Sequence, residues 1–181
     1  MAAPTILRQA TLVAGKDLRV ELRSRVLTNQ VLPFGGIVLL VLAFAQDPDR
    51  GSLRDAAPGL FWVAVFLAAL LALGRSFAIE SGRGVRDALR MSGLDGGAVF
   101  VGKAAAVAAE LLALEVVLGL GVVVLFDMHP QGVPLLVLTA VLATVGLASS
   151  GVLYGILAGA LHLRETLLPL LVLPVTAPVL L

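Results

Sequence analysis

The stretch FAIESGRGVRDALRMSGLDGGAVFVGK, residues Phe77 to Lys103, joins two long apolar runs, Pro58 to Ile79 and Lys103 to Phe126. Each run is long enough to cross a membrane as a helix, because a crossing takes roughly 20 apolar residues. The charged part between them, residues 80–95, is called the charged island below. Its charges predict a connection that lies outside the bilayer. The side of the membrane on which this connection lies determines the orientation of every span.

Composition places the chain in a membrane. Of its 181 residues 59% are hydrophobic and 14% are charged, and its mean hydropathy is +1.03, whereas soluble proteins have about 25% charged residues. There is no cysteine, which excludes disulfides and thiolate chemistry within this chain. One Trp and one Tyr give no aromatic platform for nucleic acid. The sequence therefore predicts an all-α polytopic membrane protein, with residues 1–181 forming a single transmembrane domain.

Five apolar runs predict five spans. They are Val31 to Ala45, which borrows a turn from Val26, Pro58 to Ile79, Lys103 to Phe126, Val133 to Leu163, and Thr166 to Leu181. The last run is still apolar at Leu181, so we expect a sixth span beyond it. These spans leave no room for a sizeable soluble domain in the given sequence.

The N-terminal residues 5–29 predict an amphipathic helix that lies in the membrane interface. Leu18, Leu22 and Val26 recur at i, i+4 and i+8, and basic residues occupy other faces. Such a helix can sink its apolar stripe to the acyl boundary while its basic residues meet anionic headgroups. The alternative, a solvated tail, remains open because Gly15 interrupts the helix.

The Lys and Arg residues predict the orientation. Of the thirteen, five precede the first span, five lie from Arg75 to Lys103, and Arg164 follows the fourth span, so eleven lie on one side. Cationic residues stay on the cytoplasmic face. We therefore expect the N-terminus and the island in the cytoplasm and DMHPQG, residues 127–132, outside.

Gly97, Gly102 and Lys103 match the pattern G-x-x-x-x-G-K of a phosphate-binding loop. The match fails physically, because Ala104 replaces the magnesium-binding Ser or Thr, bulky apolar residues fill the loop, and no strand precedes it. We expect a membrane-entry turn with Lys103 snorkelling to the headgroups. The chain has no motif for catalysis of its own, and we predict that it is not an enzyme.

Two acidic residues, Glu110 and Glu115, lie inside the third predicted span. An ionisable group at the membrane centre costs about 3 kcal/mol on insertion scales. Their spacing turns them about 140° apart, which argues against a shared carboxylate pair. Either they line a substrate or proton pathway, or each is protonated or hydrogen-bonded to a Thr, a Ser or the backbone of a neighbouring helix.

Other candidate sites are weaker. Gly151, Gly155 and Gly159 share one helix face, which predicts close approach of another helix. His129 and His162 are lone histidines without further ligands, so no metal site is predicted.

The island itself favours a docking element. Val85 to Met91 predicts a short amphipathic helix in which Val85 and Leu89 face a partner, with Arg86 and Asp87 at the rim. Glu80, at the start of the island, is counted with the docking residues. A solvated interhelical loop is the alternative.

Four segments resemble the cytochrome c maturation permease family, haem exporter protein B or CcmB. They are KDLRVELRSR (16–25), PGLFWVAVFLAALLALGRSFAIE (58–80), GKAAAVAAELLALE (102–115) and LLPLLVLPVTAPVLL (167–181). The resemblance implies an exporter-type, ABC-2-like bundle of six spans in the bacterial inner membrane, with an interfacial helix and a cytoplasmic coupling helix after span two. Arg86 and Gly93 depart from the family's usual apolar residue and proline.

The resemblance also implies partners and a ligand. These are a separate ATPase subunit, CcmA, which would use the ATP, the haem-handling protein CcmC, the small membrane protein CcmD, and haem as the molecule handled or exported. No cofactor is expected on this chain itself, which has only Trp62 for haem contact. Three alternatives stay open: an ABC-2 exporter of a drug, lipid or polymer, a proton-coupled carrier using Glu110 or Glu115, and a structural scaffold for other haem-handling subunits.

Overall fold

All the secondary structure in the described part of the chain is helical. The computed structural model describes residues 5–46, 50–81, 91, 93–128, 132–160 and 173, with the side chains of 50–52, 79–81 and 158–160 left out. The helices are α1 (Ile6–Ser24), the π-helical turn η1 (Leu27–Val31), α2 (Leu32–Phe44), α3 (Arg50–Ser81), α5 (Gly96–Leu125) and α6 (Val133–Ala160). Four segments of these helices are long and apolar enough to cross a membrane: Leu27–Phe44, Leu53–Ala78, Gly96–Leu125 and Val133–Leu157. The predicted fifth span, Thr166 to Leu181, lies outside the described residues.

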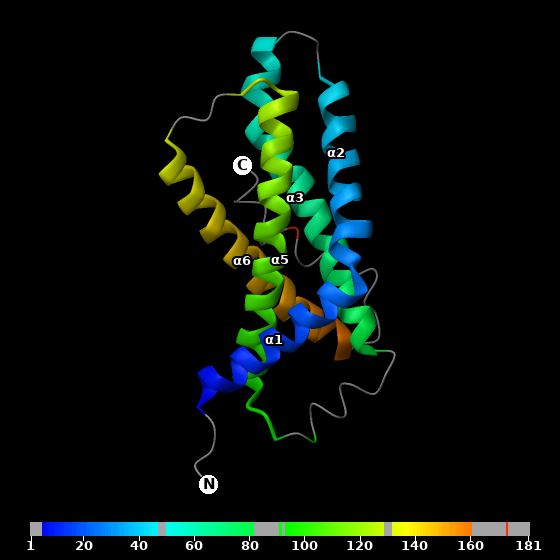
Figure 1. Cartoon of the computed structure of the whole chain (residues 1–181), viewed down its shortest axis with the longest axis vertical. Helices are drawn as coiled ribbons and strands as arrows, with labels where there is room; N and C mark the ends of the chain where they lie inside the picture. Colours follow the sequence, from blue (N-terminus) through cyan, green and yellow to red (C-terminus); the bar gives the residue numbers. More distant parts are fainter. Residues whose placement is uncertain are drawn as a thin grey trace.

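The helices form a bundle with one helix across its end. Figure 1 shows α2, α3 and α5 running along the length of the molecule, while α6 crosses them obliquely. The core between them contains many alanines, including Ala64, Ala68 and Ala69 of α3, which are completely buried. Small side chains let helix backbones approach closely, which is how helices associate in lipid, where a hydrophobic driving force between them is missing.

Helix α1 packs across α5 near the end of the bundle where α5 begins (Figure 1). It ends at Ser24, because Arg25 has a left-handed backbone and donates its N–H to the Glu21 carbonyl. The Glu21 carboxylate then accepts a hydrogen bond from the Leu27 N–H and so connects α1 to η1. The predicted interfacial helix, residues 5–29, is therefore too long at its C-terminal end, since residues 27–29 already belong to the first candidate span.

Two helices begin earlier than their apolar runs. Helix α3 starts at Arg50 and contains Pro58, the residue predicted to open its span. Helix α5 starts at Gly96, where Asp95 caps it by accepting hydrogen bonds from the Gly97 and Ala98 N–H groups at 2.8 and 3.1 Å. In α3 the added turns contain mostly polar and small residues, whereas in α5 they contain glycines and the apolar residues Val99 to Val101 behind the Asp95 cap.

The two predicted outer connections, before α3 and after α5, meet at the opposite end of the bundle. Arg54, near the start of α3, forms an ion pair with Asp127, which follows α5. Both side chains are exposed. The pair places the connection before α3 and the connection after α5 at the same end of the molecule, as the predicted alternation of spans requires.

Candidate functional site

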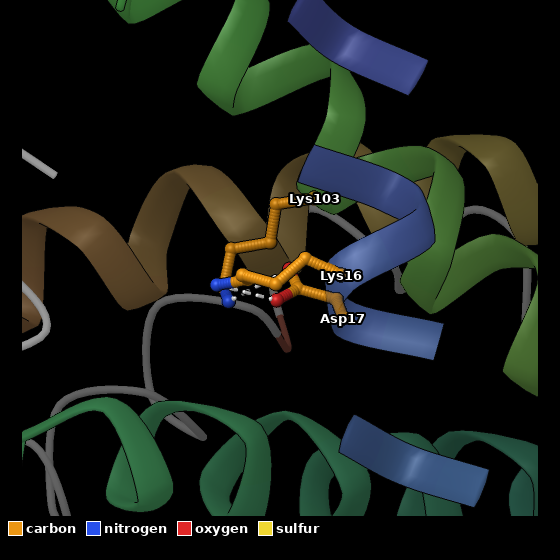
Figure 2. A network of polar contacts seen from close by, with 3 residues as sticks. All are labelled: Lys16, Asp17 and Lys103. Atoms are coloured by element: carbon orange, nitrogen blue, oxygen red, sulfur yellow. Dashed lines mark hydrogen bonds and ion pairs between the residues drawn. The ribbon is translucent and has the colours of Figure 1, made fainter. Parts of the chain in front are cut away.

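Lys103 is the centre of a junction between helices. It lies well inside α5 and only 3% of its surface is exposed. Its Nζ lies 3.4 Å from Oδ2 of Asp17 on α1 and 5.0 Å from the ring centroid of Phe77 on α3. Lys16 approaches the same Asp17 carboxylate at 2.8 Å, so that two ammonium groups share one acid (Figure 2). The prediction that Lys103 snorkels to the headgroups from an entry turn is therefore wrong.

The close approach of α1 and α5 explains why Lys103 is buried. A β-carbon added at Gly102 would lie 2.5 Å from the backbone oxygen of Ala10 and 2.8 Å from Cβ of Val13. Only glycine leaves enough room for α1 to cover this turn of α5. Directly before α5, the side chain of Gln9 accepts a hydrogen bond from the N–H of the capping residue Asp95 at 2.9 Å.

The phosphate-loop pattern thus has a structural explanation in this fold. Gly97 follows the helix cap, Gly102 is the contact point of α1, and Lys103 pairs with Asp17. The segment is helical, and the N–H of Gly97 is already bonded to Asp95, so it does not form the open backbone cradle that a nucleotide phosphate requires.

Phe77 extends the junction to a fourth helix. A β-carbon at Gly155 of α6 would overlap the Phe77 ring, and one at Gly151 would overlap Leu73. Both glycines of the predicted packing stripe therefore lie directly against α3. The contacts of Gly159, the third member, lie outside the described side chains. Asp17, Lys103, Phe77 and Gly155 together are called the four-helix junction below.

The two glutamates of α5 lie on different sides of this helix. Glu110 is partly buried and within electrostatic range of Asp17, Glu21 and Lys103, which places it beside α1. Glu115 is 6% exposed and shares a hydrogen bond with the hydroxyl of Thr144 on α6. Their spacing predicts this separation. The structure does not bring them together as a carboxylate pair.

The Thr144 hydroxyl has two acceptors within reach but only one proton. Its Oγ1 lies 2.7 Å from the carbonyl oxygen of Ala140 and also contacts Oε1 of Glu115. The second oxygen of Glu115, Oε2, is buried without a hydrogen-bond partner. Of the two predicted roles for Glu115, this geometry favours hydrogen-bonded packing against a neighbouring helix. Sequence reasoning anticipated a Thr or Ser partner but could not single out Thr144.

The docking residues of the island fall largely outside the described part. Glu80 lies in the last turn of α3 by its backbone, and its side chain is not among those described; Val85, Arg86 and Leu89 lie outside the described residues altogether. In the part of the chain that the structure covers, no group of three or more His, Asp or Glu side chains could hold a metal ion.

The fold is that of a polytopic helical membrane protein with charged groups buried at one end of its bundle. The CcmB protein family matches residues 8–181. Two curated relatives are each called heme exporter protein B. The one from Paracoccus denitrificans is 31% identical over 172 residues, covering 91% of this chain and 76% of the relative. The one from Bradyrhizobium diazoefficiens is 32% identical over 167 residues, covering 91% and 74%. No solved structure matches significantly. The chain belongs to the CcmB family.

Proposed function

We propose that this chain is the membrane-spanning permease subunit of an ABC transporter complex for cytochrome c biogenesis. Hydrolysis of ATP by a separate subunit would be coupled to export of haem, or to loading or release of a haem chaperone. The observation that carries the proposal is the match to the CcmB family along residues 8–181, together with relatives named heme exporter protein B. The four candidate spans supply the required membrane framework.

The finer architecture is an ABC-2-like bundle of six spans with a coupling helix in residues 80–95. The partners are an ATPase like CcmA, a haem-handling protein like CcmC and a small subunit like CcmD. The chain lies in the bacterial inner membrane with its N-terminus in the cytoplasm. The distribution of Lys and Arg supports this orientation.

The surface of α1 supports its role as an interfacial helix. At 100° per residue, the face that packs on α5 contains Gln9, Ala10, Val13 and Asp17. The remaining surface has an apolar arc with Leu7, Leu18 and Leu22 and a mainly basic arc with Arg8, Lys16, Arg19 and Arg23, which also contains the exposed Leu12. An apolar arc beside a basic arc suits a helix lying at the boundary between acyl chains and anionic headgroups.

Burial of Glu115 supports the ABC permease over a proton-coupled carrier that uses Glu115. A carrier needs its acid to be reached by protons from both sides of the membrane, and Glu115 is 6% exposed and bonded to Thr144. An ABC-2 exporter of the same architecture for another substrate would have different partners. Identifying the partners therefore distinguishes that exporter from a permease of cytochrome c biogenesis.

Co-purification from native membranes tests the proposal. We expect an ATPase subunit and haem-handling membrane proteins to co-purify with the tagged chain. We also expect the ATPase rate of that subunit to change when this chain is present. Changing Val85 and Leu89 to Asp should release or uncouple the ATPase while the spans still insert, because both apolar residues would face the partner. The proposal would be overturned if the chain instead co-purified with proteins of a drug, lipid or polymer export system.

A further inference from the structure

The four-helix junction lies between the two stems of the charged island. Phe77 belongs to the end of α3, the stem that leads into the island, and α3 ends at Ser81. Lys103 belongs to α5, the stem that leads out of it, and α5 begins at Gly96. The Lys103 ammonium contacts both the Phe77 ring and the Asp17 carboxylate of α1. One side chain therefore connects both stems of the island with the helix that lies across the bundle.

Stability alone does not account for a charge at this position. Taking two ions out of water costs free energy, and well-packed apolar residues often replace a buried ion pair without loss of stability. Contact between α1 and α5 is already provided by Gly102, against Ala10 and Val13. The ion pair and the cation–π contact add a directional link, since each depends on where the ammonium lies relative to its partner.

We propose that Lys103 is a positioning residue that makes α1, α3 and α5 move as one body when the charged island is displaced. This rests on the proposed function, in which the island receives the movement of the ATPase. The contact of Phe77 with Gly155 carries the movement on to α6. Loss of the ammonium removes this directional link, while the apolar packing of α3 on α5 and the Gly102 contact of α1 with α5 remain.

The first experiment separates this role from simple packing. The purified complex carries Lys103→Met alone or together with Asp17→Asn, and Lys103→Arg serves as the charge-conserving control. In the double variant neutral residues replace both members of the buried pair, and Lys16, which also contacts Asp17, is 41% exposed, so we expect thermal stability to recover. We expect this variant to bind the ATPase normally but to lose most of the permease-dependent change in ATPase rate. Recovery of both stability and coupling would overturn the proposal.

The second experiment does not depend on the ATPase. The chain has no natural cysteine, so spin labels can be placed at Leu22 on α1 and Gly74 on α3, both exposed. We expect one narrow distance distribution in the parent protein and in Lys103→Arg, and a broadened or shifted one in Lys103→Met and in Phe77→Leu. A control pair at the opposite end, Asp55 and Val124, should not change.

The two experiments fail in different ways. An unchanged α1 to α3 distance in both Lys103→Met and Phe77→Leu overturns the positioning role, whatever the ATPase does. Absence of any ATPase with the parent chain overturns the proposed function, and the spin-label distances then decide whether Lys103 positions the helices. The Phe77→Leu variant leaves the ion pair in place, so it tests the link even if Lys103→Met does not fold.

Discussion

Two ion pairs at opposite ends of the bundle differ in burial. The side chains of Lys103 and Asp17 are 4% and 13% exposed, whereas those of Arg54 and Asp127 are 45% and 61% exposed. An exposed pair is screened by water and contributes about 0–1 kcal/mol. A buried pair carries a large desolvation cost, so removing one partner leaves an uncompensated charge. Loss of one partner from a basic–acidic pair therefore has very different consequences at the two ends.

The largest effect is expected for Asp17→Ala, which removes the carboxylate beside the Lys103 ammonium and leaves this ammonium buried next to Phe77. We expect a loss of about 3–5 kcal/mol in the free energy of unfolding, the range for breaking a buried pair. Denaturant unfolding in detergent, followed by the fluorescence of Trp62, measures it. In a Lys103→Met background the same Asp17→Ala change should cost much less, and an equal cost in both backgrounds would contradict the pairing.

Gly102→Ala tests why the pair at this end is buried. The new β-carbon would lie 2.5 Å from a backbone oxygen of α1, so α1 must move away from α5. Overpacking of this kind costs about 1–3 kcal/mol, and we expect Lys103 to become accessible to amine-labelling reagents. Gly146→Ala is the matched control, because nothing lies within 4 Å of its added β-carbon. A stable Gly102→Ala protein with unchanged labelling would show that α1 does not cover Lys103.

Thr144→Val tests the buried hydrogen bond between α5 and α6, in which Glu115 is paired with a neutral hydroxyl and not with a basic side chain. It removes the hydroxyl that contacts Glu115 and keeps the shape of the side chain. We expect a loss of about 1 kcal/mol in the free energy of unfolding, since hydrogen bonds between helices in membranes contribute modestly. Thr144→Ser keeps the hydroxyl and should be close to the parent protein. A Thr144→Val protein as stable as the parent would show that the hydroxyl contact with Glu115 does not contribute to stability.

The apolar runs are sufficient to predict the four candidate spans, because roughly 20 apolar residues have few other solutions. The helix starts are missed. Arg50 to Ala57 are mostly polar or small and lie outside the apolar run, and Gly96 to Gly102 contain three glycines, which disfavour helix, beside the apolar residues Val99 to Val101. The glycine spacing of Gly151 and Gly155 predicts a close helix contact, but not that α3 makes it.

The partners of the buried polar groups cannot be predicted from local patterns. Asp17 and Lys103 are 86 residues apart, and Thr144 and Glu115 are 29 apart. Lys103 looks like a headgroup lysine because it opens an apolar run, and only the crossing of α1 over Gly102 removes it from water. Membrane spans follow from each segment alone, whereas these contacts depend on how two distant segments pack.

The smallest effect is expected for Arg54→Ala at the opposite end. Because both side chains of this pair are largely exposed, we expect a change below about 1 kcal/mol in the free energy of unfolding. The loss should shrink further when salt is raised, since exposed charges are screened within about 10 Å at 0.1 M. The cost of Asp17→Ala should change little with salt, because water and ions do not reach Lys103. Unfolding titrations of both variants at low and high salt measure the difference, and an equal salt dependence would mean that the two ends are equally open to solvent.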